Sequence, residues 1–231
     1  IKIMIKAALF DLDGVVFDTE SQYSVFWGMI GKEYHPEIPD FAQIIKGQTL
    51  VQIYDKYFSD DKIFASKVDF CSVKDEQAKI TARLDEFEQN MSYNYIAGFE
   101  DFVKDLRNNG IKCAVVTSSN IPKMLNVYQQ RPECKDYFDR VLTSEDFAKS
   151  KPDPECFLKG AAYFGVKPEE CVGLEDSFNG LKAVRASGSF TLGLATTNSA
   201  DAIRPYSDEV ISDYIGFTFA DLVKIVSLSR K

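Results

Sequence analysis

Short apolar runs that end in polar residues recur along the chain and alternate with helical patterns. The clearest runs are MIKAALF, KCAVVTSS, RVLTSED, CVGLEDS and FTLGLATT, at residues 4–10, 112–119, 140–146, 171–177 and 190–197. A short, continuously apolar run is typical of a strand that is buried on both faces. Between the runs, apolar residues recur at spacings of three and four, as they do over residues 99–106. Strands that alternate with helices of this length predict a doubly wound α/β fold with a parallel sheet.

One long segment, residues 18–90, interrupts this alternation and contains no convincing buried strand. Within it, Ile80, Leu84 and Phe87 lie at helical spacing and form one apolar face, which is the pattern of a packed amphipathic helix rather than of a cofactor site. We therefore expect residues 1–17 and 91–231 to form the α/β core. Residues 18–90 are expected to form an all-helical domain inserted into it.

The charge of the chain limits the partners it is expected to bind. Its 231 residues carry a formal net charge of -8, which argues against nucleic acid or an anionic membrane because both require a basic surface. No apolar run reaches the roughly 20 residues of a membrane helix, so we expect a cytoplasmic protein that binds a small molecule. A monomer is favoured, and the sequence leaves the oligomeric state open. His35, the only histidine, is expected to be an exposed loop residue, so a His-dependent triad or zinc site has little support.

Polar side chains follow three of the predicted strands. In a doubly wound sheet, ligands bind outside the carboxyl ends of the strands, so these side chains are expected to converge. They are carboxylates and hydroxyls, from Asp11 and Asp13, Thr117 and Ser118, and Glu175 and Asp176, and Lys151 lies at the start of a predicted helix between them. Carboxylate oxygens suit Mg²⁺, whereas hydroxyl and ammonium groups suit phosphoryl oxygens. The sequence therefore predicts a combined site for a divalent metal and a phosphate.

These residues also resemble a known family. DLDGVVFDTE, the Thr117–Ser118 pair, SKPDP and GLEDS occur in the order of the four motifs of the haloacid dehalogenase superfamily. The similarity is closest to the phosphatases and phosphomutases related to β-phosphoglucomutase, and it covers essentially the whole chain. The resemblance implies a Rossmann-like core with a helical C1-type cap inserted after the first motif.

The resemblance implies roles for the core residues. Asp11 would be the nucleophile that forms an aspartyl-phosphate, and Asp13 would be the general acid and base. Gly14 would let the chain turn without a side chain that crowds the phosphate. Thr117 would hold a phosphoryl oxygen, and Lys151 would neutralise charge on the nucleophile and the phosphate.

The resemblance also implies a Mg²⁺ site. Asp11 and Asp176 would be ligands together with the backbone carbonyl of Asp13, and Glu175 would bind directly or through water. Ser118 would assist in binding the phosphate. Mg²⁺ commonly retains several waters, so few protein ligands are needed.

The inserted segment is expected to decide which substrate enters. Lys46, Gln48 and Thr49 resemble the cap loop that contacts substrate in the mutase branch. The chain departs from that branch because Leu50 stands where the mutases carry an arginine, and Tyr23 stands where they carry a histidine. The loss of an anion clamp favours transfer of the phosphoryl group to water. We therefore expect a Mg²⁺-dependent phosphatase for a small phosphomonoester, with a phosphomutase and a non-catalytic binding protein on the same fold as alternatives.

Overall fold

The computed structural model describes residues 5–46, 48–59 and 72–229. Its centre is a six-stranded sheet in the order β3-β2-β1-β4-β5-β6, in which every pairing is parallel. The strands are β1 (Ala7–Phe10), β2 (Lys112–Val116), β3 (Arg140–Leu142), β4 (Cys171–Glu175), β5 (Phe190–Leu194) and β6 (Glu209–Ile211). The predicted doubly wound, Rossmann-like α/β fold is confirmed. The sequence analysis missed β6, which has only three residues and lies at the edge of the sheet.

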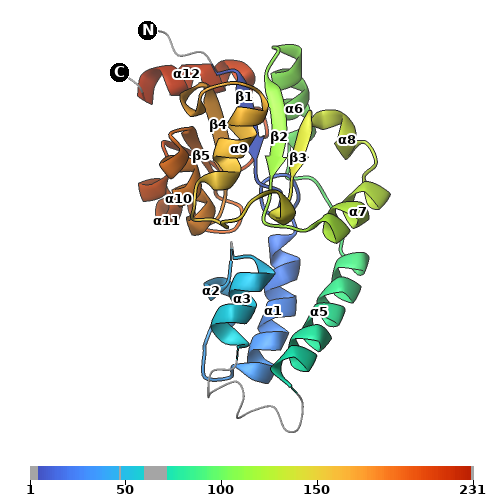
Figure 1. The fold of residues 1–231 in the computed structure, drawn as a ribbon. Coiled ribbons are helices and arrows are strands. Elements are labelled where there is room, and N and C mark those ends of the chain that lie inside the picture. Colours follow the sequence, from blue (N-terminus) through green and yellow to red (C-terminus); the bar gives the residue numbers. More distant parts are fainter. Residues whose placement is uncertain (1–4, 47, 60–71, 230–231) are drawn as a thin grey trace.

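Helices cover both faces of this sheet (Figure 1). They are α6 (Phe99–Asn108), α7 (Ile121–Gln130), α8 (Cys134–Tyr137), α9 (Glu155–Tyr163), α10 (Phe178–Ser187), α11 (Ala200–Ile203) and α12 (Phe219–Ser229). Alternate residues of each strand face opposite sides, so the two faces have separate apolar clusters. Residues of α9 and α10 pack on one face, and residues of α6, α7 and α12 pack on the other.

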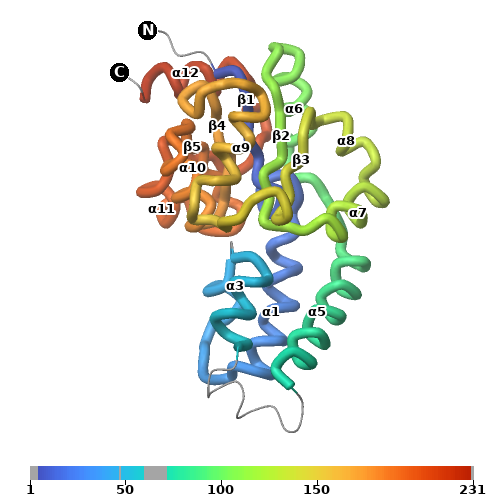
Figure 2. Tube along the Cα trace, in the orientation of Figure 1, coloured from blue at the N-terminus to red at the C-terminus, as the bar shows by residue number. Residues whose placement is uncertain are grey.

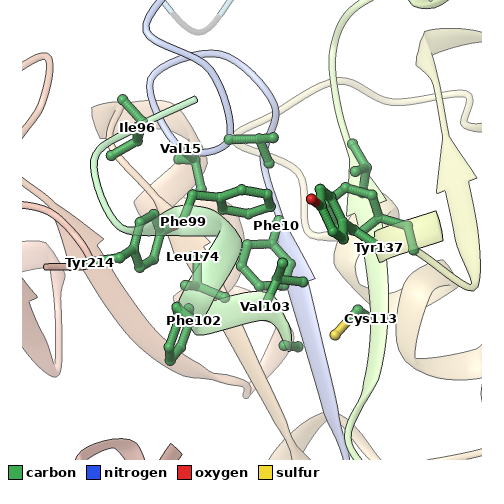
Figure 3. Packing of buried hydrophobic residues seen from close by; sticks show 14 of the residues in the cluster. Phe10, Val15, Ile96, Phe99, Phe102, Val103, Cys113, Tyr137, Leu174 and Tyr214 are labelled. Carbon is green, nitrogen blue, oxygen red and sulfur yellow. The ribbon is translucent and has the colours of Figure 1, made fainter. Parts of the chain in front are cut away.

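The larger cluster surrounds Phe10, the last residue of β1, and is rich in aromatic rings (Figure 3). Phe10 meets Phe99 edge to face with the ring centroids 5.8 Å apart, and Phe102 stacks on Tyr214 at 5.1 Å. Both geometries are favoured for aromatic pairs beyond the burial of area alone. This packing fixes the end of β1, and with it the loop that follows.

Within the described residues, four further helices lie beyond the carboxyl ends of the strands (Figures 1 and 2). These insertion helices are α1 (Glu20–Tyr34), α2 (Phe41–Ile44), α3 (Leu50–Tyr57) and α5 (Val73–Asn90). They share an apolar cluster of their own, which includes Trp27, Ile53 and Ile80. Thr49 and Ser72 begin α3 and α5 with capping boxes, in which side chains satisfy the first backbone N–H groups.

His35 was expected to be exposed, and this expectation was wrong. Only 4% of the residue is accessible, because its ring stacks on Phe41 and lies edge to face against Phe58. Its Nε2 atom lies 2.7 Å from the carbonyl oxygen of Tyr57. The histidine is part of the core of the insertion helices.

Two chain segments run side by side between the sheet and the insertion helices. Phe17 pairs with Tyr95 in an isolated bridge, and the Asp18 N–H donates to the carbonyl of Asn94 at 2.8 Å. The chain therefore leaves the α/β part near Phe17 and returns to it near Tyr95, and these two points lie side by side.

The length and hydropathy of a helix decide whether it can cross a membrane. No helix among the described ones has both the length and the apolar character that crossing a membrane requires.

Candidate active site

The carboxyl ends of three neighbouring strands form one wall of a cavity of about 690 Å³. In the register of the sheet, Phe10 pairs with both Val115 and Leu174, so the residues that follow these three lie side by side. The Asp11 N–H continues the ladder by donating to the carbonyl of Leu174 at 3.0 Å. The insertion helices form the opposite wall.

A buried lysine joins two of the carboxylates at this edge. Lys151 Nζ donates to Asp11 Oδ1 at 2.5 Å and to Glu175 Oε1 at 2.6 Å, and the lysine is only 2% exposed. Burial alone disfavours a charged lysine, but the two carboxylates outweigh it and raise the pKa of Lys151. Burial raises the pKa of Asp11 to about 7 even though Lys151 opposes that shift. One lysine therefore does not neutralise this part of the site.

Three carboxylates meet closely enough to share a metal ion. One oxygen from each of Asp11, Glu175 and Asp176 lies within 4.8 Å of the other two. Asp176 Oδ2 is buried and has no hydrogen-bond partner among the residues that the structure describes. Burial and the neighbouring Glu175 raise the pKa of Asp176 well above its ordinary value. An unpartnered oxygen in an acidic cluster is a donor set that fits a hard divalent cation such as Mg²⁺.

Gly14 makes room for this cluster. Its φ is 72°, in the left-handed region that favours glycine, and a Cβ atom there would lie 2.1 Å from Asp176 Oδ2. The atoms that a side chain here would crowd belong to the carboxylate of Asp176, and the predicted role of Gly14 beside the phosphate stays a prediction.

Two hydroxyls from the end of β2 face the same cavity. Thr117 Oγ1 accepts the Ser119 N–H at 3.0 Å and keeps its own hydrogen free to donate. Ser118 Oγ is buried and has no hydrogen-bond partner within the described part of the chain. Both hydroxyls are therefore available to an acceptor such as a phosphoryl oxygen.

Asp13 has a separate set of partners, none of which the sequence analysis identified. Its carboxylate accepts hydrogen bonds from the Thr19 hydroxyl, from Ser119 Oγ at 3.0 Å and from Lys123 Nζ at 2.6 Å. Burial by itself raises the pKa of Asp13, but Lys123 and the hydroxyls outweigh it and hold the pKa below the ordinary value. Lys123 lies on the buried side of α7 together with Met124 and Val127. A lysine on a buried helix face is rare unless it is paired, so its position in the helical pattern could have indicated a buried ion pair.

The predicted residues of the inserted segment all line the cavity, but each also has a local partner. Lys46 Nζ lies 3.7 Å from Glu20 Oε2, and Gln48 donates to the carbonyl of Ile44 at 2.9 Å. Thr49 caps α3, and Ser150 Oγ donates to its hydroxyl at 3.4 Å. Gly47, in the same predicted loop, lies outside the described residues. Contact with a leaving group stays a prediction for these three side chains.

The doubly wound sheet and the cavity at its carboxyl edge agree with the resemblance to the haloacid dehalogenase-like hydrolases. The model of that family matches residues 5–188, most of the chain, and the chain therefore belongs to it. The predicted resemblance is confirmed, and the protein is a phosphatase- or phosphomutase-like enzyme of this family.

Individual relatives agree with this assignment. The β-phosphoglucomutase of Bacillus subtilis is 28% identical over 197 residues, which cover 82% of this chain and 83% of the relative. The phosphorylated carbohydrates phosphatase of Thermotoga maritima is 25% identical over 187 residues, which cover 79% and 82%. A solved haloacid dehalogenase hydrolase of family IA, variant 3, from Entamoeba histolytica has a TM-score of 0.79 at 18% identity, with 96% and 100% covered. This last likeness shows the fold alone.

Proposed function

We propose that this protein is a Mg²⁺-dependent phosphatase that hydrolyses a small phosphomonoester through an aspartyl-phosphate on Asp11. The observation that carries the proposal is the buried contact of Lys151 with Asp11 beside unpartnered hydroxyl and carboxylate oxygens. This arrangement places a nucleophile, a lysine that stabilises its negative charge, and donors for phosphoryl oxygens within one cavity.

In the first step, a carboxylate oxygen of Asp11 attacks phosphorus, and the bond from phosphorus to the leaving oxygen breaks. Thr117 and Ser118 donate to the phosphoryl oxygens, and Lys151 offsets their negative charge. Asp13 donates a proton to the leaving oxygen, which departs as an alcohol. The result is an aspartyl-phosphate, so one difficult displacement is divided into two easier ones.

In the second step, water attacks the phosphorus of the aspartyl-phosphate. Asp13, now a carboxylate, removes a proton from this water, and the bond from Asp11 to phosphorus breaks. Inorganic phosphate leaves, and Asp13 is again protonated for the next cycle. The contact with Lys123 lowers the pKa of Asp13 and favours its carboxylate form, which this second step requires, whereas the first step requires the protonated form.

Mg²⁺ would be held by Asp11, Asp176 and the backbone carbonyl of Asp13, with Glu175 close by. When bound, the ion supplies positive charge that lets the phosphate dianion approach the acidic cluster. Glu175 also orders the loop after β4, because its Oε2 accepts the N–H groups of Asp176 and Ser177, each at 3.0 Å.

In this proposal residues 18–90 form a helical cap domain over the cavity, and residues 1–17 and 91–231 form the core. The paired segments at Phe17 and Tyr95 mark the junction. Lys46, Gln48 and Thr49 would contact the part of the substrate beyond the phosphoryl group. The core groups recognise only that phosphoryl group, so selectivity depends on the cap.

Phosphomutase activity is the second candidate, and the similarity to the β-phosphoglucomutase of B. subtilis favours it. The charges in the cavity favour hydrolysis. Each lysine that lines the cavity in the described part of the chain already contacts a carboxylate: Lys46 contacts Glu20, Lys123 contacts Asp13, and Lys151 contacts Asp11 and Glu175. Leu50 adds no charge to this wall. A second phosphate would find no uncommitted lysine there.

The test is a panel of sugar phosphates and other phosphomonoesters, each assayed for released phosphate and for isomerised product. We expect phosphate release that requires Mg²⁺, stops in EDTA and disappears in Asp11→Asn. Isomerised sugar phosphate without released phosphate would establish the mutase instead. Unchanged turnover in Asp11→Asn would reject both mechanisms.

A further inference from the structure

We propose that Lys123 is a positioning residue that fixes the carboxylate of Asp13, and that the ring of Tyr23 holds Lys123 in place. The inference rests on the proposed role of Asp13 as acid and base. It assigns a second buried lysine to the site and connects the acid/base group to the insertion helices.

Lys123 is placed by the start of α7. Asn120 is the N-cap of this helix, and its side chain accepts the Lys123 N–H at 2.9 Å. The ammonium group then reaches both oxygens of Asp13, at 2.6 Å to Oδ1 and 2.5 Å to Oδ2. The Thr19 hydroxyl also donates to Oδ1 and Ser119 Oγ also donates to Oδ2, so the contacts together fix the orientation of the carboxylate as well as its position.

The burial of Lys123 requires compensation. The residue is 2% exposed, and a lysine removed from water is costly unless it is paired. Asp13 supplies the counter-charge, and Tyr23 supplies an aromatic face 4.5 Å from the ammonium group. A cation at that distance is attracted by the quadrupole of the ring.

Tyr23 is itself fixed by a second insertion helix. It lies on α1, and its hydroxyl donates to Glu88 Oε1 on α5 at 2.7 Å. Asp13 and Lys123 belong to the α/β part of the chain, whereas Tyr23 and Glu88 belong to the insertion helices. The position of the Asp13 carboxylate thus depends on how α1 and α5 are placed against α7.

The loss of rate on removal of Lys123 should depend on the leaving group of the substrate. An alkyl alcohol must receive a proton from Asp13 as its bond to phosphorus breaks, whereas p-nitrophenolate leaves without one. Misplacement of an acid by about 1 Å can cost about 10²-fold in rate. Loss of Lys123 should therefore slow alkyl esters in kcat, with a smaller change in KM.

The experiment compares Lys123→Met with Asp13→Asn, using glycerol phosphate and p-nitrophenyl phosphate with Mg²⁺. For Lys123→Met we expect kcat for glycerol phosphate to fall by about 10- to 100-fold, with KM within about threefold. The first-turnover burst of p-nitrophenol should be nearly retained. Lys135→Met is the matched control, because Lys135 lies 4.6 Å from the ring of Tyr128 and does not line the cavity; we expect wild-type kinetics from it.

A second pair of variants keeps the inference testable if Lys123→Met fails to fold. Tyr23→Leu removes the aromatic face and should lower kcat for glycerol phosphate in the manner expected for Lys123→Met. Tyr23→Phe keeps the face and should lose clearly less. Equal losses in these two variants, or equal losses on both substrates in Lys123→Met, would overturn the inference.

The Asp13→Asn reference separates the two levels of the proposal. If Asp13→Asn distinguishes the two substrates and Lys123→Met does not, the role of Lys123 is refuted and the proposed function stands. If Asp13→Asn fails to distinguish them, the acid/base role is wrong and the inference is refuted with it.

Discussion

Asp176→Asn should stabilise the metal-free protein while it abolishes activity. Asp11, Glu175 and Asp176 have oxygens within 4.8 Å of one another, and Asp176 receives no hydrogen bond from Lys151. At this distance and an effective dielectric constant of about 20, each like-charge pair costs about 3.5 kcal/mol. Lys151 offsets part of the repulsion that Asp176 experiences. We therefore expect Asp176→Asn to raise the free energy of unfolding by about 2 kcal/mol at pH 8 in EDTA.

The dependence on pH follows from the raised pKa of Asp176. A carboxyl group whose pKa is higher in the folded state favours folding at low pH, and that contribution is lost as the pH rises. The increase in unfolding free energy caused by Asp176→Asn should therefore become smaller as the pH falls from 8 to 4. Urea unfolding at several pH values, with EDTA or with Mg²⁺, measures this increase. A variant that is less stable than wild type in EDTA at pH 8, or that Mg²⁺ stabilises as much as wild type, would refute the reasoning.

Two further pairs of substitutions, each a test variant with its control, examine the geometry around the cavity. Gly14→Ala should cost about 1 to 3 kcal/mol more in unfolding free energy than Gly110→Ala, because both residues have positive φ but only the Cβ at Gly14 would meet Asp176; equal losses in urea would contradict the clash. Thr49→Ala and Ser72→Ala should each cost about 1 kcal/mol, because each residue caps a helix. Only Thr49→Ala should change kcat/KM, and a matching change in Ser72→Ala would assign the effect to helix stability.

The sequence predicted most of the sheet and the convergence of the core residues. Continuous apolar runs marked five of the six strands, because strands buried on both faces need no polar alternation. The parallel arrangement then placed Asp11, Thr117 and Asp176 at one edge, since parallel strands end on the same side. Local rules also apply at helix ends, where Asn120 caps α7 and Gly188 ends α10 with a φ of 87°.

Contacts between distant segments could not be predicted in this way. Lys123 lies 110 residues from Asp13, and no motif in the sequence connects them. His35 was placed in a loop from its neighbours, but stacking on Phe41 and a contact with the carbonyl of Tyr57 bury it. Each of these outcomes depends on tertiary packing, which overrides the local sequence.

The central claim is that Asp11 carries the phosphoryl group, and the most direct measurement is to locate that group. Asp13→Asn should still be phosphorylated by an aryl phosphate, because the leaving group needs no proton, and hydrolysis of the product should be slow. Acid quenching after one turnover, followed by peptide mapping, should place a hydroxylamine-sensitive phosphate on Asp11. Phosphate on any other residue, or none on the protein while product forms, would contradict the account.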